Sequence, residues 1–196
     1  VEEFGDQRRS KINQDVTLSQ AFSEDDLIPA ENVTVVLSDK GWVRAAKGHD
    51  IDPASLNYKS GDSYLKSAQG RSNKLAFFMD STGRAYSLSA NSLPSARGQG
   101  EPLTGRLTPP LGAEFKDVVM GEDSQLIMLA SDAGYGFIAT LGDLSSKTKS
   151  GKNAITLPNK SAAMNIVFVQ NIESQFVCVA TNRGRLLVFP ASELPQ

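Results

Sequence analysis

Short apolar runs separated by polar, glycine-bearing turns dominate the pattern along the chain. In the first example the run 33–37 is followed by the polar turn SDKG and then by Trp42 and Val43. Apolar, often β-branched residues on both sides of a tight turn that ends in glycine predict a β-hairpin, because glycine accepts the left-handed backbone such turns require. Convincing long helical periodicity is absent, so the pattern predicts a chain of short strands.

The same hairpin pattern occurs four times. Each copy has an apolar run, a polar residue, then Asp, Ser or Asn, one free position, glycine and a second run, and the glycines are Gly41, Gly83, Gly134 and Gly184. An aliphatic residue follows each glycine by ten positions, at Ile51, Leu93, Leu144 and Leu194. Two features held at a fixed offset in four units, at intervals of 42, 51 and 50 residues, indicate a repeat protein.

One small antiparallel sheet cannot bury both of its faces, so the units need to stack on one another. Stacking around an axis covers the faces and leaves only short edges, which favours an all-β, propeller-like ring over an open solenoid. The aliphatic residue at the tenth position is expected to fill the core between neighbouring sheets. The chain stops twelve residues after Gly184, so the pattern also allows a truncated or open ring.

Charge divides the chain into two parts. Residues 1–32 hold three basic side chains against eight acidic ones, whereas residues 33–196 hold 17 basic and 14 acidic ones. We interpret residues 1–26 as a segment outside the repeats that includes an acidic linker, and residues 27–196 as the repeat domain, with a first strand from about Leu27. Because the chain does not begin with Met, we expect it to be a fragment of a longer polypeptide.

The sequence offers few groups for an active site. Cys178, the only cysteine, lies in the apolar run FVCVA, which predicts a buried side chain and excludes a disulfide framework. His49 is the only histidine, so a zinc site of the usual composition is not expected. Asp50 and Asp52 are interpreted as a turn device, and no ATP-binding glycine loop occurs. We therefore expect no catalytic residue, no metal and no cofactor in this chain.

Three aromatic residues beside the hairpin glycines are interpreted as packing residues rather than as ligand-stacking groups. They are Trp42, Tyr86 and Tyr135. Each lies in a predicted hairpin strand, where large rings usually cover a sheet face.

Three polar connections carry Lys or Arg near glycine, at residues 55–67, 94–106 and 145–157. Glycine lets a backbone approach a ligand closely and adjacent cations suit phosphate, so we expect these loops to share one rim and bind a polyanion. The alternative is that they are solvated linkers. The candidate residues for contacts with such a polyanion are the cations of these loops, of their flanks and of two hairpin turns: Lys59, Lys66, Arg71, Arg84, Arg97, Arg106, Lys147, Lys149, Lys152, Arg183 and Arg185.

Several stretches resemble a known family. The stretches DDLIPAENVTVVLSDKGWVRAAKGHDID and LNYKSGD resemble the C-terminal domain of the A subunit of bacterial type IIA topoisomerases. SLPSARGQGEPLTGRL and ASDAGYGF are more similar to topoisomerase IV members than to gyrase members, and EEFGDQRRS resembles the end of the catalytic core. The resemblance implies a β-pinwheel of four-stranded blades that exchange strands, with a basic outer rim that binds and bends duplex DNA.

Two loops refine the resemblance. Gyrase members carry a glutamine-arginine-arginine-glycine box after the first blade, and the corresponding loop here keeps only Lys59 and Gly61, which favours topoisomerase IV. The stretch ARGQG keeps part of that chemistry in Arg97, Gly98 and Gly100. None of the four tyrosines lies in a sequence similar to that of the family's DNA-cleaving tyrosine.

The resemblance also implies partners. It implies that the fragment is monomeric, binds duplex DNA and belongs to a larger A subunit that works with an ATPase B subunit. Mg²⁺ and ATP are implied for the whole enzyme only. A cytoplasmic, nucleoid-associated location is implied, with peripheral inner-membrane association as a further family trait. The alternatives are the equivalent gyrase domain, a propeller-like protein-interaction module and, least supported, a propeller enzyme.

Overall fold

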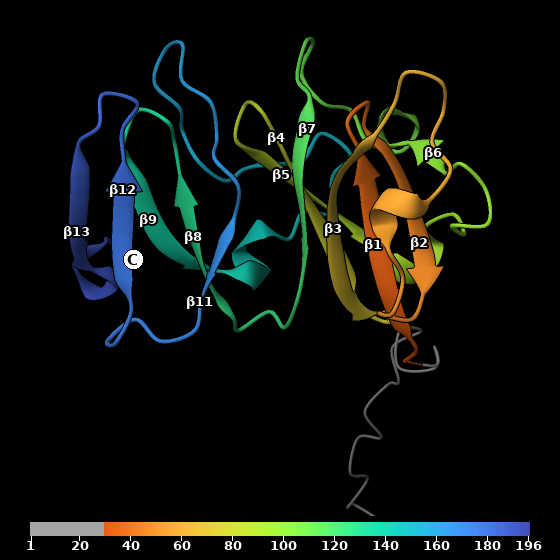
Figure 1. Cartoon of the computed structure of the whole chain (residues 1–196), viewed down its shortest axis with the longest axis horizontal. Coiled ribbons are helices and arrows are strands. Elements are labelled where there is room, and N and C mark those ends of the chain that lie inside the picture. Colours follow the sequence, from red (N-terminus) through yellow and green to blue (C-terminus); the bar gives the residue numbers. More distant parts are fainter. Residues whose placement is uncertain (1–29) are drawn as a thin grey trace, which may run out of the picture.

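The computed structural model describes residues 30–196, and in this range every regular element is a β-strand or a single turn of 3-10 helix. Figure 1 shows four small antiparallel sheets side by side along the long axis. The predicted all-β repeat architecture is therefore confirmed. The predicted core-end and linker segment 1–26, and a strand start at Leu27, lie outside the described residues. The first described strand begins at Asn32.

The first two sheets, which we call blades 1 and 2, have four strands each. Blade 1 has the order β3 (Tyr64–Arg71), β1 (Asn32–Ser38), β2 (Trp42–Lys47), β6 (Glu101–Pro102). Blade 2 has the order β7 (Phe115–Met120), β4 (Leu75–Asp80), β5 (Arg84–Ser89), β10 (Lys152–Asn153).

The other two sheets are smaller, so the prediction of four-stranded blades holds for two units of the described chain. Blade 3 consists of β11 (Val167–Val169), β8 (Leu126–Ala130) and β9 (Gly136–Thr140). Blade 4 is the hairpin β12 (Phe176–Ala180) and β13 (Leu186–Pro190). Short 3-10 turns follow the strands at Pro53–Ser55, Ala90–Ser92, Leu103–Gly105, Leu141–Leu144 and Ala191–Glu193.

Each of the first two blades is completed by chain from the following unit. The hairpin β1–β2 pairs on one side with β3, which precedes the second hairpin, and on the other side with β6, which follows it. Blade 2 repeats this scheme with β7 and β10. The strand exchange implied by the resemblance is thus present.

The hairpin turns share one geometry. In each, the glycine has a positive φ between 74° and 87° and donates its N–H to the carbonyl of the residue three positions earlier. That earlier residue also accepts, through its side chain, the N–H of the residue after the glycine. These side-chain caps are Ser38, Asp80, Ser131 and Thr181. The sequence pattern did not identify their capping role.

Two apolar cores separate the first three blades. Strand β4 is buried on both faces, with Phe78 in the core toward blade 1 and Phe77 in the core toward blade 3. The predicted aliphatic anchors Leu93 and Leu144 belong to these two cores, which confirms the prediction for the second and third units. The corresponding residues Ile51 and Leu194 are half-buried.

Blade 4 departs from the predicted burial. Its strands expose Phe176, Leu186 and Val188 by more than half, and Cys178 is exposed rather than buried. The apolar run predicted a covered strand, but within residues 30–196 only β12 and β13 form this sheet, so no flanking strand covers it. Tyr135 is also 65% exposed and is not the packing residue expected, whereas Tyr86 is buried as predicted.

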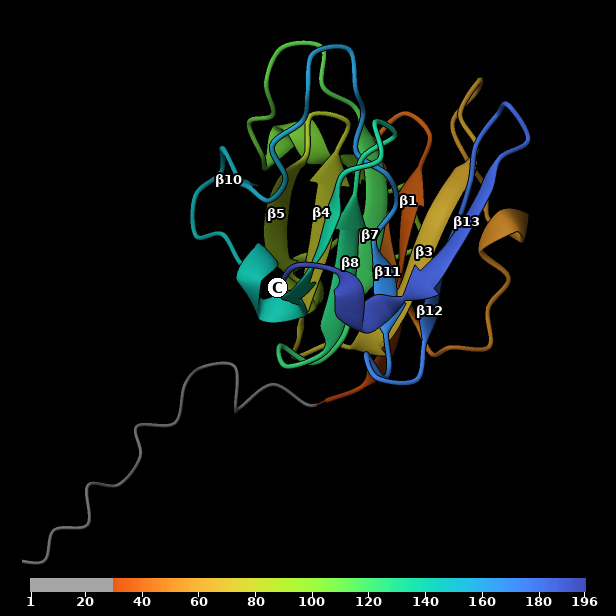
Figure 2. The same ribbon diagram turned by 90° about the vertical axis from the view of Figure 1, so that its left-hand side faces the viewer.

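The sheets have an inner and an outer edge. Strand β3 packs against β7 of the next blade, so these strands lie where neighbouring blades converge. Strands β6 and β10 form the opposite edges of the same two sheets. Figure 2 shows β10 outside β5 and β4, on the far side from β3. We call the edge formed by β6 and β10, with the loops that lead into them, the outer edge.

Candidate nucleic-acid interface

Two of the three predicted cationic loops lie at equivalent places on the outer edge. Residues 94–106 include β6, and residues 145–157 include β10. Each loop has a glycine of positive φ immediately before its exchanged strand, Gly100 at 84° and Gly151 at 67°. A Cβ on Gly100 would overlap the Val43 carbonyl oxygen, and a Cβ on Gly151 would lie 2.7 Å from the Ala85 carbonyl oxygen. These glycines are therefore required because the loops lie directly against the backbone of β2 and β5.

The third predicted loop is placed differently, which corrects the expectation that all three are equivalent. Residues 55–63 lead into β3, the inner strand of blade 1, and the loop lies over β2. The Lys59 Nζ is 3.5 Å from the centroid of the Trp42 ring, a cation–π contact. Trp42 is half-buried, so it serves as a packing surface for this loop.

A groove of about 340 Å³ lies between the segment that follows β6 and the loop that leads into β10. The Thr108 N–H donates to the Lys149 carbonyl at 2.7 Å and connects the two segments. The groove is lined by backbone and side chains of both loops and of β5: Ser87, Leu88, Gly105, Arg106, Leu107, Ser146, Lys147, Thr148 and Lys149. Three of the predicted cations therefore share one concave site.

The cations of this groove differ in how free their charges are. Lys147 and Lys149 are exposed, and no carboxylate in residues 30–196 forms an ion pair with either. Arg106 forms an ion pair with Glu101 and donates from Nη1 to the Ser92 hydroxyl. The two lysines are thus the groups available to an anion.

Side chains of β5 fix the loop that carries these lysines. The Ser87 hydroxyl accepts the N–H of Ser146 at 3.0 Å. The Arg84 guanidinium donates from Nε to the Ser150 carbonyl at 2.9 Å and from Nη2 to the Gly151 carbonyl at 3.0 Å. Arg84 was predicted as a DNA contact, but two of its donors are occupied within the protein.

Lys152 lies next to this loop on β10. Its Nζ donates to the Asp143 carbonyl at 2.7 Å, and the side chain stays exposed. The hydroxyl and N–H of Thr140 bind the Asp143 carboxylate and, with Lys152, hold the pKa of Asp143 below its ordinary value. The cation therefore borders a carboxylate that is ionised at neutral pH.

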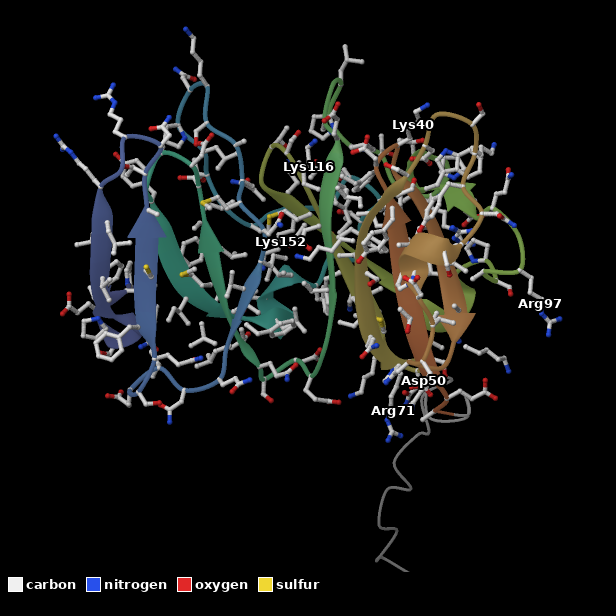
Figure 3. All side chains as sticks on the ribbon, viewed as in Figure 1. Lys40, Asp50, Arg71, Arg97, Lys116 and Lys152 are labelled. Carbon is white, nitrogen blue, oxygen red and sulfur yellow. The ribbon has the colours of Figure 1, made fainter. Side chains whose placement is uncertain are left out.

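The outer-edge loop of blade 1 carries Arg97, which points away from the molecule (Figure 3). A buried arginine that the sequence pattern did not single out holds this loop. Arg44 on β2 is 3% exposed, and its Nη1 donates to the carbonyls of Gly98 and Asn57. Its Cζ also lies 4.5 Å from the centroid of the Tyr58 ring. Arg44 differs from other arginines only in its tertiary contacts with this loop, and no pattern in the sequence indicates such contacts.

Two predicted cations lie away from the outer edge. Lys66 and Arg71 are on β3, the opposite edge strand of blade 1. The Lys66 Nζ is 2.6 Å from a carboxylate oxygen of the buried Asp117. Figure 3 shows Arg71 near Asp50, at the end of the molecule opposite the hairpin turn that carries Lys40. The eleven predicted cations therefore do not form one continuous track.

The last two predicted cations, Arg183 and Arg185, lie at the β12–β13 turn and are exposed. Lys40 occupies a similar place in the turn of blade 1 and was missed, because a single lysine in a hairpin turn gives no distinctive signal. These turn cations are separate from the outer-edge groove.

Other site chemistry is sparse. Within residues 30–196 no group of three or more metal-ligating side chains is found, and no helix is long and apolar enough to cross a membrane. The His49 Nε2 lies 3.1 Å from the Gly70 carbonyl oxygen, and the Asp52 carboxylate accepts the Ala54 N–H. The Asp52 contact agrees with the turn role predicted for this residue.

A propeller-like repeat domain that exchanges strands and carries cationic loops on its outer edge is the class that this geometry defines. The family described as DNA gyrase C-terminal domain, beta-propeller, matches residues 125–169 and 175–196. The solved structure of the E. coli ParC C-terminal domain has a TM-score of 0.81 and 51% identity, covering 85% of this chain and 67% of that one. A gyrase A C-terminal domain structure, at 17% identity and a TM-score of 0.57, shares the fold and covers 82% of this chain and 55% of that one.

Full-length relatives agree. The A subunit of DNA topoisomerase 4 from Pseudomonas aeruginosa is 55% identical over all 196 residues, and that from Escherichia coli is 49% identical over 193 residues, 98% of this chain. The chain belongs to the family of C-terminal domains of type IIA topoisomerase A subunits, in its topoisomerase IV branch. It spans about a quarter of the length of these two relatives, 26% and 25%.

Proposed function

We propose that this domain binds duplex DNA along its outer edge through contacts with the phosphate backbone. The observation that carries the proposal is the groove in which Lys147 and Lys149 lie beside Arg106 and pair with no carboxylate of residues 30–196. Lysine ammonium groups and exposed backbone N–H groups suit phosphate, and they carry little information about base sequence. Binding is therefore largely independent of sequence.

The placement of the loops also supports bending of the DNA. The outer edges of blades 1 and 2 belong to consecutive sheets of one stacked array. A duplex that contacts Arg97 and then Lys149 therefore runs along the outer edges of both sheets. Bending a duplex costs elastic energy, which additional phosphate contacts offset. Arg183 and Arg185 on blade 4 extend the set of cations available to a longer segment.

For the whole enzyme we propose that the domain positions the transported duplex for decatenation and supercoil relaxation. The names of the full-length relatives support this role. The remainder of the A subunit and the ATPase B subunit are the proposed partners. Mg²⁺ and ATP are proposed for those parts and not for this domain. A monomeric fragment and a cytoplasmic, nucleoid-associated location, with peripheral inner-membrane association, remain proposals from the resemblance.

A salt titration of duplex binding tests the proposal. With about four to six phosphates contacted, log K against log salt is expected to have a slope of about −4 to −5 for any duplex sequence. Replacing Arg97, Lys149 and Lys152 by Glu should abolish most of the binding between about 50 and 200 mM salt. The matched control is Arg71→Glu, which changes an exposed cation at the inner edge and should retain most of the affinity. Weak, salt-insensitive binding by the unmodified chain would favour a protein-interaction module instead.

A further inference from the structure

The arginines that hold the outer-edge loops have a role distinct from that of the exposed cations. Arg84 is the first residue after the turn glycine of blade 2, and its guanidinium reaches across to the carbonyls of Ser150 and Gly151. Arg44 on blade 1 holds Gly98 in the loop that carries Arg97. In both blades an arginine of the strand next to the outer-edge strand, β2 in blade 1 and β5 in blade 2, binds backbone carbonyls of the cationic loop.

We infer that Arg84 is a positioning residue for DNA binding, which acts through Lys147 and Lys149 and does not itself contact phosphate. The inference rests on the proposed function of the outer edge. Donors that already bind two carbonyls at 2.9 and 3.0 Å are not available to a phosphate without loss of those bonds. The hydrogen bonds of Arg84 keep the loop ordered in the protein without DNA.

The loop between the two attachment points is short and internally bonded. Ser87 holds it at Ser146, Arg84 holds it at Ser150 and Gly151, and the Gly151 N–H donates to the Thr148 carbonyl. The two exposed lysines of the groove lie between these points. A loop fixed in this way loses less conformational entropy on binding, so its lysines bind phosphate more tightly than the same lysines on a free loop.

Position alone does not produce this arrangement. Arg185 follows the turn glycine of blade 4 as Arg84 does in blade 2, yet its side chain is exposed, and its guanidinium makes no hydrogen bond or ion pair within residues 30–196. Arg185 is therefore a matched control, because it has the same residue type and turn position without a loop to hold.

A double-mutant cycle on the 196-residue chain tests the inference. Arg84→Met is expected to weaken duplex binding about fivefold in the unmodified chain and by less than about 1.5-fold in the Lys147→Met, Lys149→Met background. Arg185→Met should have the same effect in both backgrounds. An equal loss for Arg84→Met in both backgrounds would show a direct phosphate contact and overturn the inference.

Two further measurements separate the ways in which the inference could fail. Amide hydrogen exchange at Gly151 and Lys152 should become faster in Arg84→Met while the core strands stay protected, and unchanged exchange would overturn the positioning role. Arg84→Lys retains the charge without the two-pronged donor and should bind DNA like Arg84→Met. Recovery of affinity by this variant would also overturn the inference. Failure of the unmodified chain to bind any duplex would instead contradict the proposed function.

Discussion

The ammonium of Lys66 on β3 and the carboxylate of Asp117 on β7 form an ion pair, with 2.6 Å between Nζ and Oδ1, where two neighbouring blades meet. Asp117 is 1% exposed, and its second oxygen accepts the Ile166 N–H at 2.6 Å just before blade 3. One carboxylate therefore connects the inner strands of blades 1 and 2 to the start of β11.

Removal of the lysine from this pair should destabilise the domain without a specific effect on DNA. Lys66→Met leaves a buried charge with one hydrogen bond, so we expect the free energy of unfolding to fall by about 3 kcal/mol. Chemical denaturation measures the loss. Lys59→Met is the control, because the Lys59 ammonium lies over a ring and pairs with no carboxylate among residues 30–196. A loss of duplex affinity in fully folded Lys66→Met protein would restore Lys66 as a phosphate contact.

Acid should loosen the turns of blade 1 through Asp62. Burial alone would raise the pKa of Asp62, but hydrogen bonds from the Ser38 hydroxyl and the Lys40 and Ser63 N–H groups outweigh it and lower the pKa. A folded-state pKa below the unfolded value of 3.8 contributes stability that is present above pH 3.8 and is lost as pH falls through the folded pKa.

Thermal unfolding over a pH range from neutral to strongly acidic measures this contribution. Asp62→Asn should be less stable than the unmodified chain at neutral pH, and the difference should shrink below pH 3.8 as the native carboxyl is protonated. A difference that stays constant over the whole range would show that the charge of Asp62 is not involved.

The glycines before the exchanged strands should be more sensitive to substitution than a turn glycine in open space. Gly151→Ala places a Cβ against the Ala85 carbonyl and the Tyr86 ring in a left-handed backbone, so we expect a loss of about 3 kcal/mol. Gly184→Ala, where nothing lies within 4 Å, should cost only the backbone strain of about 1 kcal/mol. Denaturant midpoints of the two variants compare them directly. Equal losses would mean that Gly151 is not in close contact with the backbone of β5.

Replacement of Lys160 by glycine should increase the stability of the domain. It is the only non-glycine residue of positive φ in residues 30–196, at 65°, in a turn equivalent to those that contain Gly61 and Gly112. Lys160→Gly removes left-handed strain and adds some unfolded-state entropy, so we expect a net stabilisation of about 0.5 kcal/mol. Differential scanning calorimetry should show a higher melting temperature, and Lys160→Ala is the control that should show none.

Local chemistry explains which features could be predicted from the sequence. The turn glycines and the anchors Leu93 and Leu144 were predictable because each satisfies a requirement visible in its own short stretch. Strands β6 and β10 were not, because two residues carry no periodicity and their pairing depends on an edge distant in sequence. The prediction that the three cationic loops share one rim was wrong for the same reason, because residues 55–63 resemble the other loops in composition but lead to the inner strand β3.

The candidate site shows the same division. Composition identified Lys147 and Lys149, which are exposed as expected, but it gave equal weight to Lys66 and Arg84. Only tertiary contacts reveal that Lys66 faces Asp117 and that Arg84 faces two carbonyls. Cys178 was misjudged because its burial depends on strands beside the β12–β13 hairpin and not on its neighbours in sequence.

Strands β3 and β6 complete a sheet whose hairpin, β1–β2, lies earlier in the chain. The repeat in the sequence and the blade in the structure therefore have different boundaries. During synthesis the first hairpin has to wait until its successor's hairpin has also emerged before both of its edges are paired. A duplicated or deleted repeat would likewise change the outer edge of the repeat before it, so a mutation in one repeat can alter the surface of the preceding one.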